Sequence, residues 1–232
     1  MTIKILGVIP ARRGSKGVRN KNVRPLAGKS LIERTHECAV QAGVLDRVVL
    51  STDDPAAMKI AQRIGLEAPF CRPAELAGDE TPMIDVVIHA LDTLEAGGYM
   101  PDAVLLLQPT SPLRKPEHIR QAVGLLDGYD SVCSVVPLPK THCPHHVMRI
   151  RDNATLDYFL PEGARYTRRQ DVPQAYVREG TVYLTRVGVL RCRRSFYGDR
   201  CRPMVLDESE SLSIDNESDW LAACRRLEAT EQ

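Results

Sequence analysis

Short apolar runs alternate with amphipathic segments over the first two-thirds of the chain, and this order restricts the fold more than any other feature. The alternation is typical of parallel strands joined by crossover helices, so it predicts an α/β protein with a Rossmann-like, mostly parallel sheet. Strands are predicted at 3–9, 47–51, 67–71, 103–107 and 131–136, and helices at 30–43, 55–64, 81–96 and 116–126. The run 103–107 is the most apolar, so we expect it near the centre of the sheet.

Two of the predicted helices carry signals for their ends. Ser30 and Glu33 have the spacing of a capping box, and Gly43 can adopt the left-handed conformation that ends a helix. In the next helix, Pro55 occupies the first turn and Gly65 follows the last. These signals predict the helix boundaries as well as the helices.

The rhythm changes after residue 137. Prolines then separate short alternating segments, which suit an irregular, β-rich arm better than further strand–helix units. We expect one domain over residues 1–232, with residues 137–187 inserted into it as the arm. A closing helix is predicted over residues 217–229, with Trp220 and Leu221 in the core.

The charge is balanced overall, with 31 Lys and Arg against 30 Asp and Glu, but it is unevenly spread. Balance removes the electrostatic case for a nucleic-acid partner, which needs a strongly basic domain. Residues 1–32 contain eight basic side chains and no acidic one, whereas residues 204–224 contain acidic but no basic side chains. The two stretches indicate a site for a polyanion and a site for a cation.

The chain also lacks the signals of export and membrane insertion. No apolar run approaches the roughly 20 residues that cross a bilayer, and no signal-peptide core precedes the first Arg cluster. The seven cysteines are widely spaced and form no C-x-x-C pair, which is typical of reduced thiols. We therefore expect a cytoplasmic protein with no membrane partner.

A loop rich in Gly, Arg and Lys follows the first predicted strand, over residues 10–22. Its glycines let backbone N–H groups approach an anion, and its cations supply the charge that a triphosphate needs. It matches neither the Walker A pattern nor the G-x-G-x-x-G dinucleotide turn. Ligands of open parallel sheets bind beyond the carboxyl ends of the strands, where this loop lies. The alternative interpretation is a solvated basic surface loop.

The loop and five further segments resemble, in the same order, the signature blocks of the acylneuraminate cytidylyltransferases, the CMP-sialic acid synthetase family. The matching segments are Ile9–Gly17 with Lys21–Asn22, Ser51–Asp53, Arg72–Ala77, Leu107–Arg114, Arg169–Ala175 and Ser213–Asp215. Together they span almost the whole chain. The resemblance implies the fold of the nucleotide-diphospho-sugar transferases, with a small β-rich dimerisation arm.

The resemblance also implies an activity, in which CTP and a 2-keto sugar acid give a CMP-sugar and pyrophosphate. The expected acid is a nonulosonic acid of the sialic, legionaminic or pseudaminic type, and the expected assembly is a homodimer whose arms cover each other's sugar sites. Three alternatives stay open: a 3-deoxy-manno-octulosonate cytidylyltransferase, another sugar nucleotidyltransferase, and a non-catalytic nucleotide-sugar sensor.

The nucleotide site implied by the resemblance lies mainly in the basic loop. Its expected members are Ala11, Arg12, Gly14, Ser15, Lys16, Lys21, Asn22 and Arg72. Arg12 and Lys21 are the catalytic candidates, because fixed cations stabilise the charge that develops during nucleotidyl transfer. For Arg72, a loop salt bridge with Glu75 is the structural alternative.

The sugar site implied by the resemblance is spread over three segments. Its expected members are Gln108, Arg168, Arg169, Gln170, Tyr176 and Arg178. Relatives place Arg and Asn near the last of these positions, whereas this chain has Arg178 and Glu179. Replacing an amide by Glu exchanges a donor for an acceptor, which favours a legionaminic or pseudaminic acid over sialic acid.

Asp215 is the expected catalytic ligand of Mg²⁺, the expected cofactor. A single carboxylate suffices where phosphate oxygens and water complete the coordination. Relatives often show D-x-D here, whereas this chain has Ser213-Ile214-Asp215, with Asp207 and Asp219 as possible substitutes. The run of His142, Cys143, His145 and His146 lacks a second ligand pair, so we interpret it as a sugar-site or arm loop and not as a zinc site.

Overall fold

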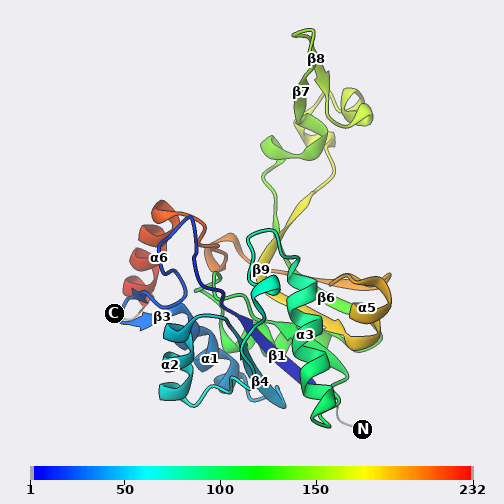
Figure 1. Ribbon diagram of the computed structural model, residues 1–232. Helices are drawn as coiled ribbons and strands as arrows, with labels where there is room; N and C mark the ends of the chain where they lie inside the picture. The colour runs from blue at the N-terminus through cyan, green and yellow to red at the C-terminus, as the bar shows by residue number, and fades with distance from the viewer. Residues whose placement is uncertain (1–2, 231–232) are drawn as a thin grey trace.

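A six-stranded sheet forms the centre of the computed structural model, which describes residues 3–230 (Figure 1). Its strand order is β10-β6-β9-β5-β1-β4. The strands are β1 (Ile5–Pro10), β4 (Arg47–Ser51), β5 (Ala103–Leu106), β6 (Ser131–Pro137), β9 (Tyr176–Arg186) and β10 (Cys201–Val205). β1 is parallel to β4 and β5, and β10 is parallel to β6, whereas β9 runs antiparallel to both neighbours. The sheet confirms the predicted α/β fold.

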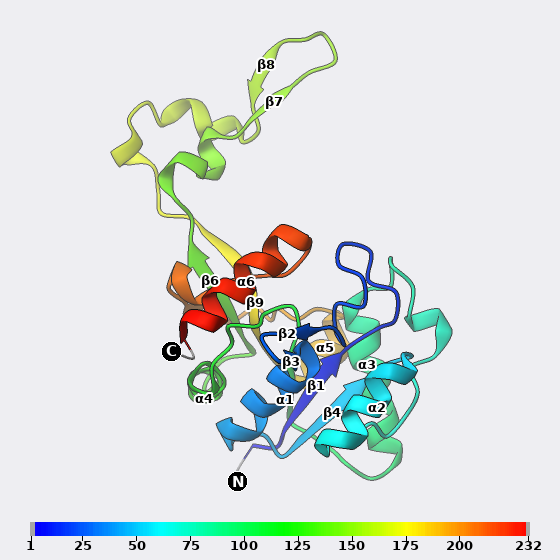
Figure 2. The ribbon, with the colours of Figure 1, turned by 90° about the vertical axis from the view of Figure 1, so that its left-hand side faces the viewer.

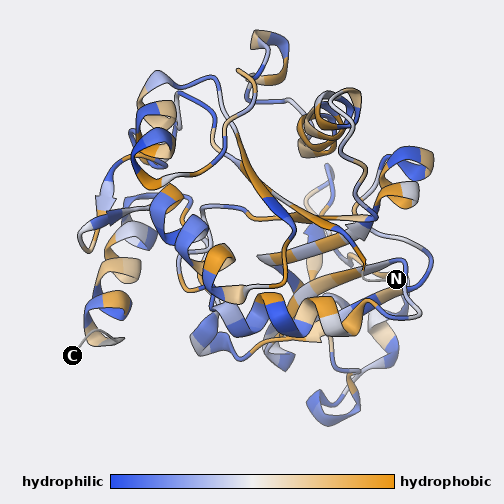
Figure 3. Cartoon of the chain, turned by 90° about the horizontal axis from the view of Figure 1, so that it is seen from below, coloured by the Kyte–Doolittle hydropathy of each residue, from blue (hydrophilic) through white to orange (hydrophobic). Residues whose placement is uncertain are grey.

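Helices cover both faces of the sheet. They are α1 (Leu31–Ala42), α2 (Pro55–Ile64), α3 (Met83–Ala96), α4 (Pro116–Leu125), α5 (Val187–Arg193) and α6 (Glu217–Thr230). Apolar residues of α1, α2 and α4 pack on one face, and those of α3 and α5 on the other. Hydrophobic residues accordingly concentrate on the strands and the inner sides of the helices (Figure 3).

The first strand contributes to both layers of the core. Ile5 and Ile9 face the layer of α1, whereas Leu6 and Val8 face that of α3, and all four are fully buried. Successive side chains of a strand point to opposite faces, so a strand covered on both sides is apolar throughout. β5 is buried in the same way, as we expected of the most apolar run.

The predicted strand over residues 67–71 is wrong. Only one bridge forms there, between Val49 and Glu67. Pro69 has no backbone N–H to donate, so the segment cannot extend its pairing along the edge of the sheet. A short hairpin that the sequence patterns did not predict, β2 (Pro25–Leu26) with β3 (Lys29–Ser30), precedes α1.

The closing helix α6 is confirmed, but only part of its predicted core is buried. Trp220 is 3% exposed and packs with Leu26, Leu31 and other residues of a third apolar cluster. Leu221 is 55% exposed, so its placement in the core is wrong. One residue of helix turns a side chain by about 100°, which carries Leu221 out of the buried stripe.

The chain between β6 and most of β9 forms a protruding arm (Figures 1 and 2). It contains the hairpin β7 (Met148–Ile150) with β8 (Leu156–Tyr158) and four short 3₁₀ helices, η2 (Lys140–His142), η3 (Pro144–His146), η4 (Pro161–Arg165) and η5 (Arg169–Asp171). Two further 3₁₀ helices, η1 (Ala74–Leu76) and η6 (Glu208–Glu210), lie outside it. The range 137–187 includes β9, which belongs to the central sheet, so the protruding part ends near residue 175.

Several large apolar side chains on the arm face away from any core. Ile150 is 79% exposed, Leu156 65% and Phe159 58%. His142, Cys143, His145 and His146 lie in η2 and η3, and Cys143 is buried with its thiol against the carbonyl oxygen of Pro173. None of the helices within residues 3–230 is long and apolar enough to span a bilayer.

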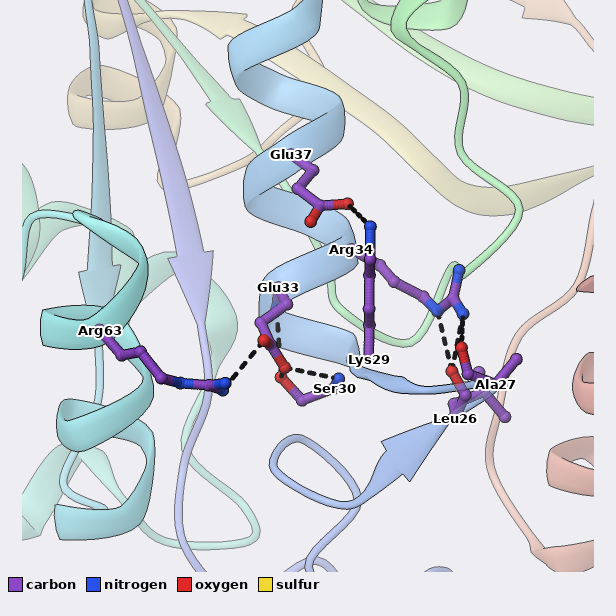
Figure 4. A network of polar contacts seen from close by, with 8 residues as sticks. All are labelled: Leu26, Ala27, Lys29, Ser30, Glu33, Arg34, Glu37 and Arg63. Carbon is purple, nitrogen blue, oxygen red and sulfur yellow. Dashed lines mark hydrogen bonds and ion pairs between the residues drawn. The ribbon is translucent and has the colours of Figure 1, made fainter. Parts of the chain in front are cut away.

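The predicted capping box at the start of α1 is present (Figure 4). The Ser30 hydroxyl accepts a hydrogen bond from the Glu33 N–H at 3.3 Å, and the Glu33 carboxylate accepts one from the Ser30 N–H at 2.8 Å. Arg63 of α2 pairs with the same carboxylate at 2.9 Å, so the cap also joins two helices. At the other end, Gly43 is left-handed with φ of 65°.

Replacing Ser30 by Ala removes the acceptor for one orphan N–H of α1 while leaving the backbone unchanged. We expect the free energy of unfolding to fall by about 1 kcal/mol in urea denaturation. Val40→Ala is the control, because Val40 lies on the same helix and is 60% exposed. Equal stability of Ser30→Ala and the wild type would contradict a role for the cap.

Candidate active site

The basic loop begins where β1 leaves the sheet, and β4 holds its first residues. The Ala11 N–H donates to the Ser51 carbonyl at 2.9 Å, and the Thr52 hydroxyl donates to the Ala11 carbonyl. The Arg13 N–H donates to the Asp53 carboxylate at 2.8 Å. The Ser51-Thr52-Asp53 segment therefore fixes the path of the loop at the carboxyl ends of two parallel strands.

The last part of the chain closes the loop from the other side. Gly17 lies so close to this segment that a Cβ there would be 1.8 Å from the Asp215 carbonyl oxygen. The Lys21 ammonium donates to the Ile214 carbonyl at 2.6 Å, and the Ile214 N–H donates to the Thr110 carbonyl at 2.9 Å. Only Gly fits at position 17, because any side chain would clash with backbone.

A cavity of about 330 Å³ opens between these segments. It is lined by Pro10, Arg12, Ser15, Lys16, Gly17, Lys21, Asn22, Arg72, Met83, Gln108, Pro109, Thr110 and Asp215. Eight residues expected from the sequence meet here, namely Arg12, Ser15, Lys16, Lys21, Asn22, Arg72, Gln108 and Asp215. Ala11 and Gly14 belong to the same loop without lining the cavity. The alternative of a plain solvated loop does not explain this convergence.

Two of the loop cations share one carboxylate that the sequence patterns did not single out. Asp79, between η1 and α3, forms ion pairs with both Arg12 and Lys16. The hydrogen bond from Lys16, together with the charge of Arg12, lowers the pKa of Asp79, so it is ionised at neutral pH. Its position after Gly78 in the sequence carries no signal of this contact. Asp79 thus pairs with two cations that could otherwise bind an incoming anion.

Lys21 is the most enclosed cation of the loop. Its side chain is 14% exposed, and its ammonium lies 3.9 Å from the Asp215 carboxylate. Burial lowers the pKa of Lys21, and the charge of Asp215 partly offsets that effect. A partly desolvated ammonium interacts more strongly with a phosphate than one in bulk water does.

Arg72 is buried, with 3% of its surface exposed, and it binds β4 instead of Glu75. Its guanidinium donates to the Ser51 carbonyl at 2.5 Å and to the Ser51 hydroxyl at 3.1 Å. Burial lowers the pKa of Arg72 to about 10, and the charge of Arg12 adds to this shift. Arg72 therefore anchors the cavity wall, and the alternative interpretation, a loop salt bridge with Glu75, is absent from the contacts of the described residues.

The residues expected at the sugar end do not all reach this cavity. Arg168, Arg169 and Gln170 lie on the protruding arm, where Arg168 pairs with Asp171 at 2.7 Å. Tyr176 and Arg178 lie at the base of the arm, and the Arg178 guanidinium is 3.5 Å from the Tyr197 hydroxyl. Of the six, only Gln108 lines the cavity of its own chain.

The expectation that Glu179 offers an acceptor to the sugar is wrong. Its carboxylate is 7% exposed and accepts hydrogen bonds from the Thr181 N–H at 2.8 Å and the Thr181 hydroxyl at 2.7 Å. Both oxygens are therefore used within the strand. Glu179 therefore no longer favours a legionaminic or pseudaminic acid over sialic acid.

Asp215 is suited to a metal that phosphate oxygens also hold. Its side chain is 75% exposed at the cavity, and its nearest partners are the Ser213 hydroxyl at 3.3 Å and Lys21. Asp219 instead accepts the N–H groups of Asp215 and Asn216, and Asp207 accepts that of Ser209, so neither adds a second free carboxylate. Within residues 3–230 no group of three or more His, Cys, Asp or Glu could hold a metal alone. The donor set fits Mg²⁺ bound mainly by a substrate.

A second cavity is larger but lacks the chemistry of the first. It measures about 850 Å³ and lies between α1, the start of α4 and the end of α6. The cations in its wall are already engaged, since Lys115 pairs with Glu210, and Arg34 donates to the carbonyls of Leu26 and Ala27. The smaller cavity, with Arg12, Lys16 and Lys21, is therefore the candidate active site.

Known protein structures share this architecture. The chain superimposes on CMP:2-keto-3-deoxy-manno-octonic acid synthetase complexed with CTP with a TM-score of 0.73, 19% identity, and coverage of 99% of this chain and 100% of that one. The corresponding values for 4-diphosphocytidyl-2C-methyl-D-erythritol synthase of Anaerococcus prevotii are 0.67, 15%, 98% and 100%. At these identities the likeness shows the fold alone.

Sequence comparisons are more specific. CMP-N,N'-diacetyllegionaminic acid synthase of Legionella pneumophila is 34% identical over 99% of both chains. The N-acylneuraminate cytidylyltransferase of Escherichia coli is 33% identical over 95% of this chain and 51% of its own length. The pseudaminic acid cytidylyltransferase of Campylobacter jejuni is 31% identical over 78% of each. The cytidylyltransferase family model matches residues 6–228. The chain belongs to the cytidylyltransferase family.

Proposed function

We propose that this chain joins CTP to a nonulosonic acid of the sialic, legionaminic or pseudaminic type, giving the CMP-sugar and pyrophosphate. The observation that carries the proposal is the cavity where Arg12, Lys16 and Lys21 converge at the carboxyl end of β1. The three sequence relatives named above, at 31% to 34% identity, are named for legionaminic, acylneuraminic and pseudaminic acids. Their agreement on the class of acid supports the substrate.

In the reaction, a hydroxyl oxygen of the acid forms a bond to the α-phosphorus of CTP, the bond from that phosphorus to the bridging oxygen of pyrophosphate breaks, and the hydroxyl proton passes to solvent. Negative charge accumulates on the leaving pyrophosphate. Arg12, Lys16 and Lys21 line the cavity, so they stabilise this charge once the triphosphate replaces Asp79 as the partner of Arg12 and Lys16. The loop N–H groups near Gly17 add donors to the same oxygens.

Mg²⁺ is part of the proposal, with Asp215 as its protein ligand. When bound, the ion neutralises phosphate charge and orients the triphosphate. Asp215 is brought to the cavity because Gly17 and Lys21 hold the preceding backbone. Lys21 lies near the same carboxylate, so it restrains Asp215 without using both of its oxygens.

The arm supports a homodimer as the second part of the proposal. Its exposed apolar residues, Ile150, Leu156 and Phe159, are placed to be buried by a second copy. Arg168, Arg169 and Gln170 lie at and in η5 of the protruding arm, which suits recognition of the acid in the site of a partner. A cytoplasmic location completes the proposal, since all seven cysteines are free thiols.

The octulosonate alternative has less support. The solved synthetase for that acid is 19% identical to this chain, whereas the relatives named for nonulosonic acids exceed 30%. A non-catalytic sensor has Ser213 as its only argument, because Ser213 stands where relatives often carry Asp. Pyrophosphate release distinguishes both alternatives from the proposed reaction.

Pyrophosphate release tests the reaction directly. With Mg²⁺, the protein is offered each nucleoside triphosphate against sialic, legionaminic, pseudaminic and deoxyoctulosonic acids, and we expect turnover with CTP and a nine-carbon acid. Arg12→Ala should lower kcat by about 100-fold or more, because one preorganised charge is lost from the transition state. Arg13→Ala is the matched control, since that side chain does not line the cavity. EDTA should abolish turnover.

Three results would contradict this assignment. Turnover with deoxyoctulosonic acid alone would establish the first alternative, and turnover with another triphosphate would establish a different nucleotidyltransferase. CTP binding without pyrophosphate release, unaffected by Mg²⁺, would establish the sensor.

Asp79 should compete with the triphosphate for Arg12 and Lys16. Asp79→Asn removes this competing charge, so we expect CTP and inorganic tripolyphosphate to bind more tightly by a factor of a few in isothermal titration calorimetry. Glu80→Gln is the control, because it removes the same charge from the neighbouring exposed residue. Weaker binding by Asp79→Asn would show instead that Asp79 supports the bound nucleotide.

Sedimentation velocity tests the dimer. We expect the wild type to sediment as a dimer and Ile150→Glu with Leu156→Glu to sediment as a monomer, since two charges would be buried without partners. Val40→Glu changes an apolar residue on α1 that is also mostly exposed, at 60%, and should leave the dimer intact. A monomeric wild type at the concentration used for kinetics would refute the proposed assembly.

A further inference from the structure

Arg114 is a buried cation that serves only backbone carbonyls. It is 7% exposed, and its guanidinium donates to the carbonyls of Thr181 at 2.8 Å, Gln108 at 2.7 Å and Gly180 at 3.4 Å. Its remaining nitrogen, Nη1, is buried and has no hydrogen-bond partner among the described residues. Burial without an ion pair is costly for a guanidinium, so packing alone does not account for this residue.

Two of the carbonyls that Arg114 binds, those of Gly180 and Thr181, lie on a bulge in β9. The pairing of β6 with β9 passes from Cys133 opposite Tyr183 to Val135 opposite Arg178, so the two strands slip out of register between these pairs. Ser134 fills the gap, because its hydroxyl donates to the Glu179 carbonyl at 2.9 Å and accepts from the Val182 N–H at 2.8 Å. Bulges beside active sites commonly redirect neighbouring groups.

At the bulge, the backbone of Gly180 lies very close to the wall of the cavity. A Cβ on Gly180 would lie 2.9 Å from Oε1 of Gln108 and 2.8 Å from the Ser111 hydroxyl. The Ser111 hydroxyl is itself buried and has no hydrogen-bond partner among the described residues. Arg114 thus binds the carbonyl of Gln108, and the side-chain oxygen of Gln108 occupies space that is free only because residue 180 is Gly.

We propose that Arg114 and Gly180 are positioning residues for Gln108, and that they determine which acid the site accepts. The inference rests on the proposed function, because it assigns the acceptor side of the same cavity to Gln108. The Gln108 amide carries both donors and acceptors, so a fixed orientation selects the pattern of substituents on the acid. The cations of the basic loop lie on other elements, so Arg114 and Gly180 take no part in binding the triphosphate.

Gly180→Ala is the discriminating variant. Its methyl group must displace the side chains of both Gln108 and Ser111, so we expect the KM for the acid to rise about tenfold or more, with the KM for CTP unchanged within a factor of about two. Gly124→Ala is the matched control, because a Cβ at Gly124, in α4, meets no atom within 4 Å. Arg114→Lys keeps the charge but loses the fork of donors, and should shift the same KM in the same direction.

A double-mutant cycle isolates the path through Gln108. If Gly180 acts through that side chain, adding Gly180→Ala to Gln108→Ala should change the KM for the acid by less than about twofold. If the fold-changes in the KM for the acid that the two substitutions cause singly multiply in the double variant, the inference would be overturned. A KM for CTP that rises as much as the KM for the acid would also overturn it.

A measurement independent of turnover separates this inference from the proposed function. In ¹H–¹⁵N spectra, the side-chain amide of Gln108, assigned by its loss in Gln108→Ala, should move in Gly180→Ala and stay in place in Gly124→Ala. If the wild type turns over no acid but the Gln108 resonance moves in Gly180→Ala, the proposed function would be refuted and the positioning role of Gly180 would stand. An unmoved resonance would refute the positioning whatever the kinetics show.

Discussion

Burial of β1 on both faces is the constraint on which the rest of the molecule depends. Its apolar side chains serve both core layers, so helices must cover both sides of the sheet, and β4 and β5 flank it in parallel. Parallel strands place their carboxyl ends at one edge. The basic loop, the Ser51-Thr52-Asp53 segment and Gln108 follow β1, β4 and β5, and the candidate active site forms where they meet.

Two buried cations and a partly buried one then give this edge its shape. Arg72 binds the end of β4, Lys21 binds the backbone beside Asp215, and Arg114 binds the bulge of β9. Each donates to backbone carbonyls, so each uses charge to fix the path of the chain as well as to create a positive field. Buried charges cost free energy unless they are satisfied by hydrogen bonds. The cavity is thus both electropositive and rigid, which suits a reaction that depends on positioning.

Local signals predicted much of the fold. The helices whose caps the sequence displays, such as α1 with Ser30 and Gly43, agree closely with the structure, and so do the apolar strands. Errors arose where long-range packing decides. Residues 67–71 look like a strand but carry a proline at an edge, and Leu221 follows a buried Trp on a helix whose apolar stripe is narrow.

The candidate active site also divides into features that local sequence signals predict and features that long-range packing decides. Residues inside recognisable blocks, such as Arg12, Lys21 and Gln108, were predictable, because their spacing and neighbours are local properties of the sequence. Asp79 and the carbonyl contacts of Arg114 were not, since they depend on where a loop and a bulge lie in space. The misplaced role of Glu179 has the same origin, because only the fold reveals that Thr181 occupies both oxygens.

The contact between Lys21 and Ile214 has a consequence for biosynthesis. The two residues are 193 positions apart in the sequence, yet one hydrogen bond joins them at the wall of the cavity. A growing polypeptide can form β1 and its loop early, but it lacks this wall until translation has passed the segment that touches Gly17. This wall of the cavity is therefore completed only after all six strands of the central sheet have been synthesised.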